Sequence, residues 1–320
     1  MKSVWTMGEM IVEIMRPRAE MPHSKPDVYM GPYASGAPAI MISSAARMGA
    51  KSGIIGGVGQ DAHGQMIVDR LEGCGVDCDK VLRSADKSTG NAFVMYHDDG
   101  SREFIFHIGG TAATACGVPD ISNVTDPGYF HLMGCSLTAD KDYCARILET
   151  AEAFRAKGAK FSFDPNIRPE LLKGKIMDYY TEILEACDVL LTGKSELRFL
   201  FGQEWEDAVR NLLKAKDRLV VVKDGSRGTN FFNREEAFSV ATYPATEVDP
   251  TGAGDCFDAT FLSMVCLGYD YRTAVHYANA AGAHAVGKAG PMEGNTFKAD
   301  LDAYLASAPK AAEKDIPMLY

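Results

Sequence analysis

Short apolar runs alternate along this chain with segments in which apolar residues recur at helical spacing. Short runs bounded by turn residues are typical of buried strands, and the wider recurrence is typical of amphipathic helices. Their alternation predicts an α/β protein with a mostly parallel sheet and helices on both faces. The predicted strands are residues 4–7, 52–55, 129–132, 160–163, 189–191 and 219–222, and the predicted helices are residues 40–48, 65–72, 141–156, 175–186 and 274–286.

Two segments, residues 11–33 and 88–108, interrupt this alternation. Within the second, residues 91–96 and 102–107 flank an Asp-Asp-Gly turn, which predicts a β-hairpin. The chain carries no internal repeat, low-complexity tract or long linker. We therefore expect residues 1–320 to form one domain, with these two segments as a separate feature of it.

The most informative run, DPTGAGDCFD at residues 249–258, ends where an apolar helical pattern begins. Small residues at a helix start leave the backbone amides, and the positive end of the helix dipole, open to a phosphate. Asp255 is expected at or near the N-cap, with Gly268 closing the helix, and its carboxylate can accept a proton. A plain capping role for Asp255 is the alternative, but the whole run favours a phosphoryl-transfer site.

This run resembles the signature of the ribokinase-like (PfkB) carbohydrate kinases, in which the last Asp is the base. Residues 35–64, 164–169, 223–228 and 278–283 resemble other stretches of that family in the same order, so the likeness covers residues 5–294. The resemblance implies a three-layer αβα fold. It also implies that segments 11–33 and 88–108 form a small β lid over the sugar, and that the protein is a homodimer.

The resemblance further implies an ATP-dependent sugar kinase. Asp255 would take the proton of the attacking sugar hydroxyl, while the amides of Gly252, Ala253 and Gly254 would stabilise charge on the transferred phosphoryl group. Mg²⁺ is expected to bridge the phosphates. The family has an Asn-x-x-Glu motif near this ion; the matching positions are Gly193 and Glu196, so Glu196 is expected to hold Mg²⁺ through water.

A monovalent cation such as K⁺ is implied at Asp249, because Asp249 and Thr251, with carbonyls near Val286 and Gly290, match a region where several family members bind one. A plain turn role for Asp249 is the alternative.

For the nucleotide, the resemblance implies a loop after a buried strand, together with the helix start at Gly252 and Gly254 and a helix beside the adenine. The loop residues are Lys223, Gly225, Ser226 and Gly228, and the helix residues are Asn279 and Ala283 with Ala280 and Gly282. A lysine at a strand end can instead be solvated, and an alanine-rich stretch can serve only helix packing.

For the sugar, the resemblance implies contacts from Glu13, Gly36, Ala37 and Arg168 in addition to Asp255. Glu13 stands where the family usually has Asp, and Ile40 where it has a sugar-binding Asn. A surface salt bridge is the alternative for Arg168.

His107 and Ile108 occupy positions where ketoacid-sugar kinases carry Tyr and Arg. Because a guanidinium is the best partner for a carboxylate, the sequence favours a neutral ketohexose such as fructose or tagatose. A 2-keto-3-deoxygluconate-type sugar comes next, followed by a nucleoside.

Two functions of other classes compete with the kinase. The run GVGQDA at residues 57–62 has the form of a dinucleotide fingerprint, which would suit an NAD-dependent oxidoreductase and predicts cofactor binding there. A non-catalytic sugar or nucleotide sensor would keep the glycines but has no need of the base at Asp255. A Walker-type loop ending in Gly193-Lys194-Ser195 is excluded, because residue 188 is Asp where the loop requires its first glycine.

Composition limits the binding partners and the cellular compartment that we expect for this protein. A hydrophobic content of 46% supports a sizeable core, and a net charge of −10 disfavours nucleic acid or an anionic membrane as a partner. The eight cysteines form no C-x-x-C pair and are expected to be reduced thiols, with Cys256 either sensing the site or filling the core. Glu9 and Glu13 interrupt the N-terminal apolar stretch, so we expect no signal peptide and a cytoplasmic enzyme.

Overall fold

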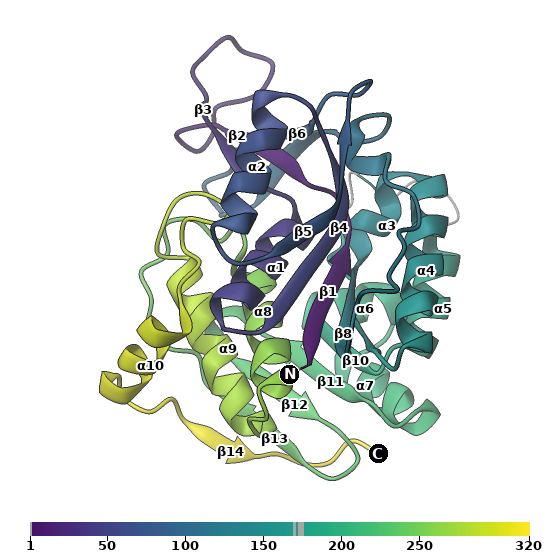
Figure 1. Cartoon of the computed structure of the whole chain (residues 1–320). Helices are drawn as coiled ribbons and strands as arrows, with labels where there is room; N and C mark the ends of the chain where they lie inside the picture. The colour runs from purple at the N-terminus through teal and green to yellow at the C-terminus, as the bar shows by residue number, and fades with distance from the viewer. Residues whose placement is uncertain (1, 169–170, 172–175) are drawn as a thin grey trace.

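The structure, a computed structural model, describes residues 2–168, 171 and 176–320. A large sheet runs through its centre with helices on both faces, and a smaller sheet lies at one end (Figure 1). The adjacent strands β11, β10, β9, β8, β1, β4 and β5 of the large sheet are parallel to one another, and β12, β13 and β14 extend this sheet with antiparallel pairing. Its order is β14(Glu313–Asp315), β13(Ala237–Val240), β12(Thr229–Phe232), β11(Leu219–Lys223), β10(Val189–Gly193), β9(Lys160–Asp164), β8(Pro127–Met133), β1(Ser3–Met7), β4(Lys51–Gly59) and β5(Asp77–Ser84).

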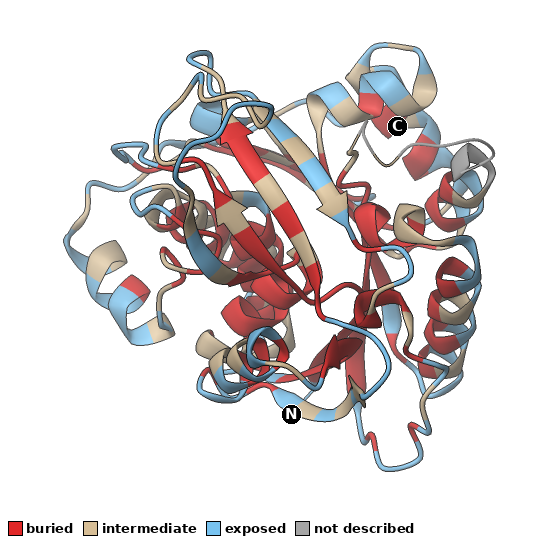
Figure 2. Ribbon diagram, turned by 90° about the horizontal axis from the view of Figure 1, so that it is seen from above, coloured by how far each residue is buried: buried red, intermediate tan, exposed pale blue. Residues whose placement is uncertain are grey.

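Two hydrophobic cores lie on opposite faces of this sheet, because successive strand side chains point to opposite faces. Along β11, Val221 belongs to one core, whereas Val220 and Val222 belong to the other. The first core is covered by α1(Ala37–Arg47), α2(Ala62–Glu72), α8(Ala253–Cys266), α9(Tyr271–Ala285) and α10(Lys298–Ser307). The second is covered by α3(Gly134–Ala139), α4(Lys141–Ala156), α5(Ile176–Ala186), α6(Lys194–Phe201) and α7(Trp205–Ala215). Figure 2 shows the resulting gradient, with buried residues on the strands and on the inward helix faces.

The smaller sheet, which we call the lid, lies above the carboxyl ends of the parallel strands (Figure 1). It consists of β3(Met30–Ser35), β2(Ile11–Met15), β6(Gly90–Tyr96) and β7(Arg102–His107), in that order. Strands β6 and β7 pair antiparallel around the Asp-Asp-Gly turn, in which Gly100 has a φ of 81°. The predicted lid segments and hairpin are therefore confirmed.

The predicted three-layer architecture is confirmed, and each predicted strand and helix has its counterpart. The predicted helix start Lys175, like Pro169, lies outside the described residues. Helix α8 begins at Ala253 with Gly252 as its N-cap, so Asp255, predicted at or near the N-cap, is the third helical residue. The single-domain organisation stays a prediction. Among the helices of the described ranges, none is long and apolar enough to cross a bilayer.

Candidate active site

Two adjoining pockets open at the carboxyl ends of the central strands, where ligands of open α/β sheets bind. The lid pocket, of about 240 Å³, is enclosed by lid residues of β2 and β7 and by residues that follow β1, β9, β10 and β11. The outer pocket, of about 590 Å³, lies between the loop after β11 and helices α8 and α9. Lys223, Pro250 and Gly254 line both pockets, so the two meet at the start of α8.

The start of α8 presents free backbone donors at this junction. Gly252 has a φ of 81°, and a Cβ there would lie 2.5 Å from the Pro291 carbonyl oxygen, so only glycine fits. Within the described part of the chain, the amides of Gly252, Gly254 and Asp255 donate to no protein acceptor. Ala253 makes only a 3.4 Å bond, to the Pro250 carbonyl. Such a helix start binds an anion.

Asp255 projects from the first turn of α8 into the lid pocket. Its side chain is buried, and Asn166 Nδ2 donates to its Oδ1 over 3.3 Å. Burial, with the negative charge of Asp164, raises its pKa to about 7, although Arg168 and Lys223 oppose the shift. A carboxyl group with a pKa near neutrality is suited to taking a proton. The alternative of a plain N-cap is wrong, because Gly252 holds that position.

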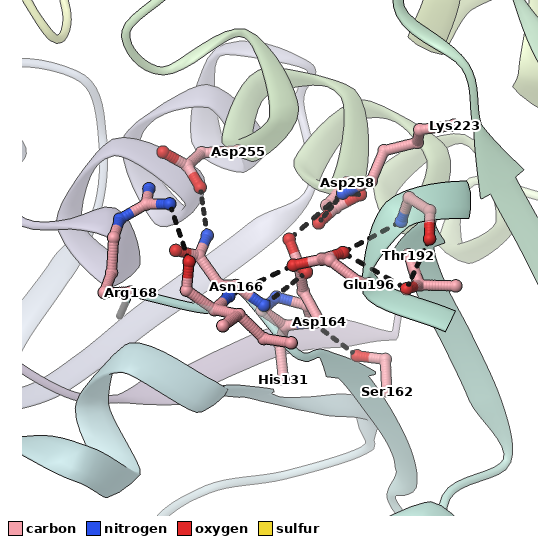
Figure 3. A network of polar contacts seen from close by, with 12 residues as sticks. His131, Ser162, Asp164, Asn166, Arg168, Thr192, Glu196, Lys223, Asp255 and Asp258 are labelled. Atoms are coloured by element: carbon pink, nitrogen blue, oxygen red, sulfur yellow. Dashed lines mark hydrogen bonds and ion pairs between the residues drawn. The ribbon is translucent and has the colours of Figure 1, made fainter. Parts of the chain in front are cut away.

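Lys223 joins the two pockets through a buried ion-pair network (Figure 3). Its ammonium lies 3.0 Å from Asp164 Oδ2 and 2.9 and 3.0 Å from the two oxygens of Asp258. A Cβ built on Gly254 would lie 3.8 Å from Lys223 Nζ, which places the ammonium beside the free amides. The two aspartates raise the pKa of Lys223 against the effect of burial, so it stays charged. The alternative of a solvated lysine is wrong.

The predicted sugar-contacting residues meet in the lid pocket: Glu13, Gly36, Ala37 and Arg168, together with Ile40. Glu13 Oε2 is buried without a hydrogen-bond partner, and burial raises the pKa of Glu13 to about 7. Gly36 has a φ of 104°, and a Cβ there would lie 2.3 Å from the Glu9 carbonyl oxygen, so the backbone packs closely at this wall. Because Glu13 Oε2 has no partner among the described residues, it is an acceptor to which a sugar hydroxyl could bind.

Arg168 lies with Asn166 and Asp255 at one end of the network (Figure 3). Among the described residues, its guanidinium donates one hydrogen bond, over 3.4 Å to the Ile167 carbonyl, and forms no ion pair. The alternative of a surface salt bridge is wrong, because the side chain lines the lid pocket.

Several residues of the pocket were not singled out from the sequence: Glu9, Arg102, Phe104, Asp164 and Asn166, with Asp258 behind them. Glu9 is buried and accepts hydrogen bonds from Cys135 and Ser136. Asp164 and Asn166 lie within the DPNIRP run, so their chemistry was visible there. Asp258 follows Asp255 by one helical turn on an otherwise apolar helix, a buried-carboxylate signal that the sequence did carry.

The prediction that positions 107 and 108 face the sugar is wrong. His107 is exposed and bonds Asn91, Ile108 is buried, and neither lines the lid pocket. Arg102, at the start of the same strand, does line it. The absence of arginine at 108 therefore does not leave the pocket without a guanidinium from the lid.

Glu196 lies in the lid pocket, and protein donors use both its oxygens. Oε1 accepts from the Ile167 amide over 3.1 Å, and Oε2 accepts from the Gly193 amide over 2.8 Å. Among the described residues, no group of three acidic, His or Cys side chains could hold a metal ion. This donor set fits Mg²⁺ bound mainly by phosphates and water, with Glu196 orienting a water. A Cβ on Gly193 would make ordinary van der Waals contact, with Glu196 Oε2 nearest at 3.6 Å, so a side chain could be placed there without a clash.

The outer pocket contains the predicted nucleotide residues: Lys223, Gly225, Ser226, Gly228, Asn279, Gly282 and Ala283. The Asn279 amide accepts from Thr229 Oγ1 over 2.7 Å and donates to the Val240 and Ala241 carbonyls. Its side chain thus fixes the pocket wall. Ala280 does not line this pocket but packs in the core, as its helix-packing alternative requires.

Asp249 holds a turn together. Its carboxylate accepts from Tyr96 Oη over 3.0 Å, from the Thr251 amide over 2.9 Å and from the Gly290 amide over 2.9 Å. The Val286 carbonyl already accepts the amides of residues 248 and 249. These contacts establish the turn role, and a cation at Asp249 stays a prediction.

The GVGQDA run forms a strand-to-helix turn that is closed by its own carboxylate. Asp61 caps α2, accepting from the Gly64 amide over 2.8 Å and from the amide of Thr89 over 2.8 Å. A Cβ on Gly57 would lie 2.2 Å from the Ala112 carbonyl oxygen, so the glycine serves close packing. The dinucleotide interpretation is therefore wrong for this turn.

Cys256 is a buried core thiol, and burial raises its pKa to about 12. Its Sγ lies 2.9 Å from Asn295 Oδ1.

A ribokinase-like α/β body, a small β lid and two pockets that meet at an open helix start define a kinase that transfers phosphate to an alcohol. The sequence model described as "pfkB family carbohydrate kinase" matches residues 1–297. The chain belongs to the pfkB family of carbohydrate kinases and is an ATP-dependent phosphotransferase.

Relatives agree with this assignment. "Probable fructokinase-5" of Arabidopsis thaliana is 29% identical over 290 residues, covering 86% of this chain and 89% of its own length. The crystal structure of a "putative Ribokinase II" from E. coli in complex with ATP and Mg²⁺ has a TM-score of 0.89 at 37% identity, covering 96% of this chain and 99% of that one. Fructokinase of Vibrio cholerae, with fructose, ADP and calcium bound, has a TM-score of 0.84 at 25% identity, covering 95% and 99%.

Proposed function

We propose that this chain phosphorylates a ketohexose such as fructose or tagatose, with the sugar in the lid pocket and MgATP in the outer pocket. The observation that carries the proposal is Asp255, a buried carboxylate with a pKa near 7 that projects into the lid pocket from a helix start with free amides. Sequence relatives named fructokinase, from Arabidopsis thaliana and Oryza sativa among others, support a ketohexose.

In this mechanism Asp255 accepts the proton of the sugar hydroxyl as its oxygen attacks the γ-phosphorus of ATP, and ADP leaves. The amides of Gly252, Ala253 and Gly254, with the Lys223 ammonium beside them, stabilise negative charge on the transferred group. Glu13 and Arg168, with Gly36 and Ala37 as the close wall, orient the sugar. Bound Mg²⁺ supplies charge neutralisation on the phosphates, and Glu196 would orient its water.

A ketoacid sugar such as 2-keto-3-deoxygluconate is the second candidate. Arg102 and Arg168 both line the lid pocket, and two guanidinium groups provide donors for a carboxylate. Three neighbouring carboxyl groups, Glu9, Glu13 and Asp255, favour hydroxyl groups instead, so the neutral sugar comes first.

The test is ADP release from MgATP with ketohexoses, pentoses, nucleosides and aldonic or ketoaldonic acids, with Asp255→Asn as the matched variant. Turnover with one sugar that the variant lacks supports the proposal and names the substrate. ATP binding without turnover on any acceptor would support the sensor instead. Repeating the assay with K⁺ replaced by N-methylglucamine tests the cation proposed at Asp249.

A homodimer formed through the lid is part of the proposal. Val28, in the segment between β2 and β3, and Ile105 on β7 are 63% and 41% exposed, which leaves apolar side chains for contact with a second copy. Light scattering after size-exclusion chromatography measures the mass of the assembly, and a monomer at micromolar concentration would contradict this part of the proposal.

A further inference from the structure

The tip of the lid hairpin is fastened to the loop that precedes α8. Tyr96 ends β6 and Arg102 begins β7, so the two residues flank the hairpin turn. Tyr96 Oη lies 3.0 Å from Asp249 Oδ1 and 3.1 Å from Thr251 Oγ1, and an Arg102 guanidinium nitrogen lies 3.0 Å from Thr251 Oγ1. Two strands of the lid thus bond one loop of the body.

The hydrogen bonds among these four residues are all donated in one direction, from Arg102 towards Asp249. Arginine only donates, and the Asp249 carboxylate accepts. Tyr96 has a single hydroxyl proton, which it gives to Asp249, so Thr251 must donate its own proton to Tyr96 and accept from Arg102. We call this sequence of hydrogen bonds, from Arg102 through Thr251 and Tyr96 to Asp249, the hydroxyl chain.

The hydroxyl chain is shielded from water at its loop end. Thr251 is 6% exposed and Asp249 is 3% exposed. Hydrogen bonds in such surroundings reinforce one another, and loss of one member leaves the next unpaired.

Two members of the hydroxyl chain, Thr251 and Arg102, lie beside groups of the reaction. Thr251 precedes Gly252, where the free amides of α8 begin. Arg102 lines the lid pocket together with Glu13 of the same lid. A sugar bound in the lid pocket therefore lies beside Arg102, and Arg102 donates a hydrogen bond to Thr251 in the loop that leads to the free amides.

We propose that Tyr96, Arg102 and Thr251 are positioning residues that couple sugar binding under the lid to alignment of the Gly252–Asp255 amides. The inference rests on the sugar kinase proposed above and adds a second role to the lid. Beyond covering the sugar, the lid holds the phosphoryl-binding amides in their reactive arrangement. The expected signature is a loss of kcat with little change in the KM for MgATP.

The first experiment compares Tyr96→Phe, Thr251→Val and the double variant with wild-type enzyme, using the sugar that the acceptor panel identifies. Each single variant removes one hydroxyl, and we expect kcat to fall about three- to tenfold. Because both hydroxyls belong to one chain, the double variant should lose about as much as a single one rather than the product. Tyr29→Phe is the matched control, since Tyr29 lies just before β3 of the lid and its hydroxyl, among the described residues, is hydrogen-bonded to His23 alone.

The second experiment measures amide hydrogen exchange with sugar alone, in the absence of nucleotide. In wild-type enzyme, sugar should slow exchange both in β2 of the lid and in residues 249–255. In Thr251→Val it should slow exchange in the lid but no longer in residues 249–255. A general loss of stability would speed exchange in both regions, which separates positioning from folding.

Multiplicative losses in the double variant, or sugar protection of residues 249–255 that persists in Thr251→Val, would overturn the coupling. Wild-type turnover with unaffected variants defeats this inference alone. Absence of turnover by wild-type enzyme on every acceptor defeats the proposed function itself.

Discussion

Replacement of Lys223 by methionine tests the buried network at the junction of the two pockets. Lys223 lies between Asp164 and Asp258, whose side chains are 4% and 0% exposed. Methionine retains much of the apolar stem but removes the ammonium. The two carboxyl groups then face each other without their cation.

The magnitude follows from burial. Removal of one partner of a buried ion pair costs about 3 to 5 kcal/mol. Unfolding entropy is about 2.1 cal/mol/K per residue, so 320 residues give about 0.7 kcal/mol per kelvin. The melting temperature of Lys223→Met should therefore fall by about 4 to 7 °C. Because Nζ also lies beside Gly254, kcat should fall as well, by a larger factor than the KM for sugar rises.

The assay is scanning calorimetry at pH 7.5 without ligands. Lys214→Met is the matched control, since Lys214 is exposed on α7 and should change stability by no more than about 0.5 kcal/mol. Lys223→Met/Asp258→Asn removes one of the two stranded carboxyl groups, and it should recover part of the lost stability. A melting temperature of Lys223→Met within about 1 °C of the control, a difference of less than about 1 kcal/mol, would refute the ion-pair reasoning.

Three further predictions concern single residues of the site. Because the folded state raises the pKa of Asp255 to about 7, kcat/KM should rise with pH through that value, and Asp255→Asn should lose about 10²- to 10⁴-fold in kcat. The raised pKa contributes stability to the fold below the unfolded pKa near 3.8, and this contribution is lost as the pH rises through about 7. The melting temperature of Asp255→Asn, taken relative to that of wild type, should therefore rise between pH 5 and pH 8. Gly252→Ala should lower kcat at least about tenfold and cost about 1 to 3 kcal/mol, since its Cβ would meet the Pro291 carbonyl. Cys256 should resist alkylation in the native enzyme, because burial raises its pKa to about 12.

Each of these has its own control. Asp255→Asn with a flat pH difference in melting temperature would contradict the burial argument. Gly49→Ala shares a positive φ of 87° but meets nothing within 4 Å, so an equal effect at both glycines would contradict the clash at Gly252. Peptide mapping that finds Cys256 among the first alkylated thiols would contradict its burial.

The fold could be predicted from sequence because its signals are local. The strands are short apolar runs, and the lid hairpin is indicated by an Asp-Asp-Gly turn. The helix start at 252–255 was visible because glycine and aspartate carry positional meaning at such a point. One local signal was misleading: GVGQDA matches a dinucleotide turn, and the contacts of Asp61 with Gly64 and Thr89 exclude that interpretation.

The parts of the site that sequence could not predict depend on contacts between distant segments. Arg102 reaches Thr251 across 149 positions, and Lys223 reaches Asp164 across 59. No local pattern around a lysine at a strand end distinguishes a solvated ammonium from one held by two aspartates. The helical spacing indicated that Asp258 is a buried carboxylate, but its pairing with Lys223, 35 positions away, follows only from the fold.

The two helix starts of α2 and α8 differ in one respect that governs what each can bind. At α2 the chain supplies its own anion, Asp61, tethered within reach at an effective concentration that no dissolved phosphate could match. At α8 the corresponding cap is Gly252, which has no side chain to offer, so the same electrostatic attraction is left for a ligand. The specificity of this enzyme for a phosphoryl group thus depends on the missing cap side chain at α8. The N-terminus of α2 is occupied by Asp61, whereas the N-terminus of α8 remains free to bind the transferred group in each turnover.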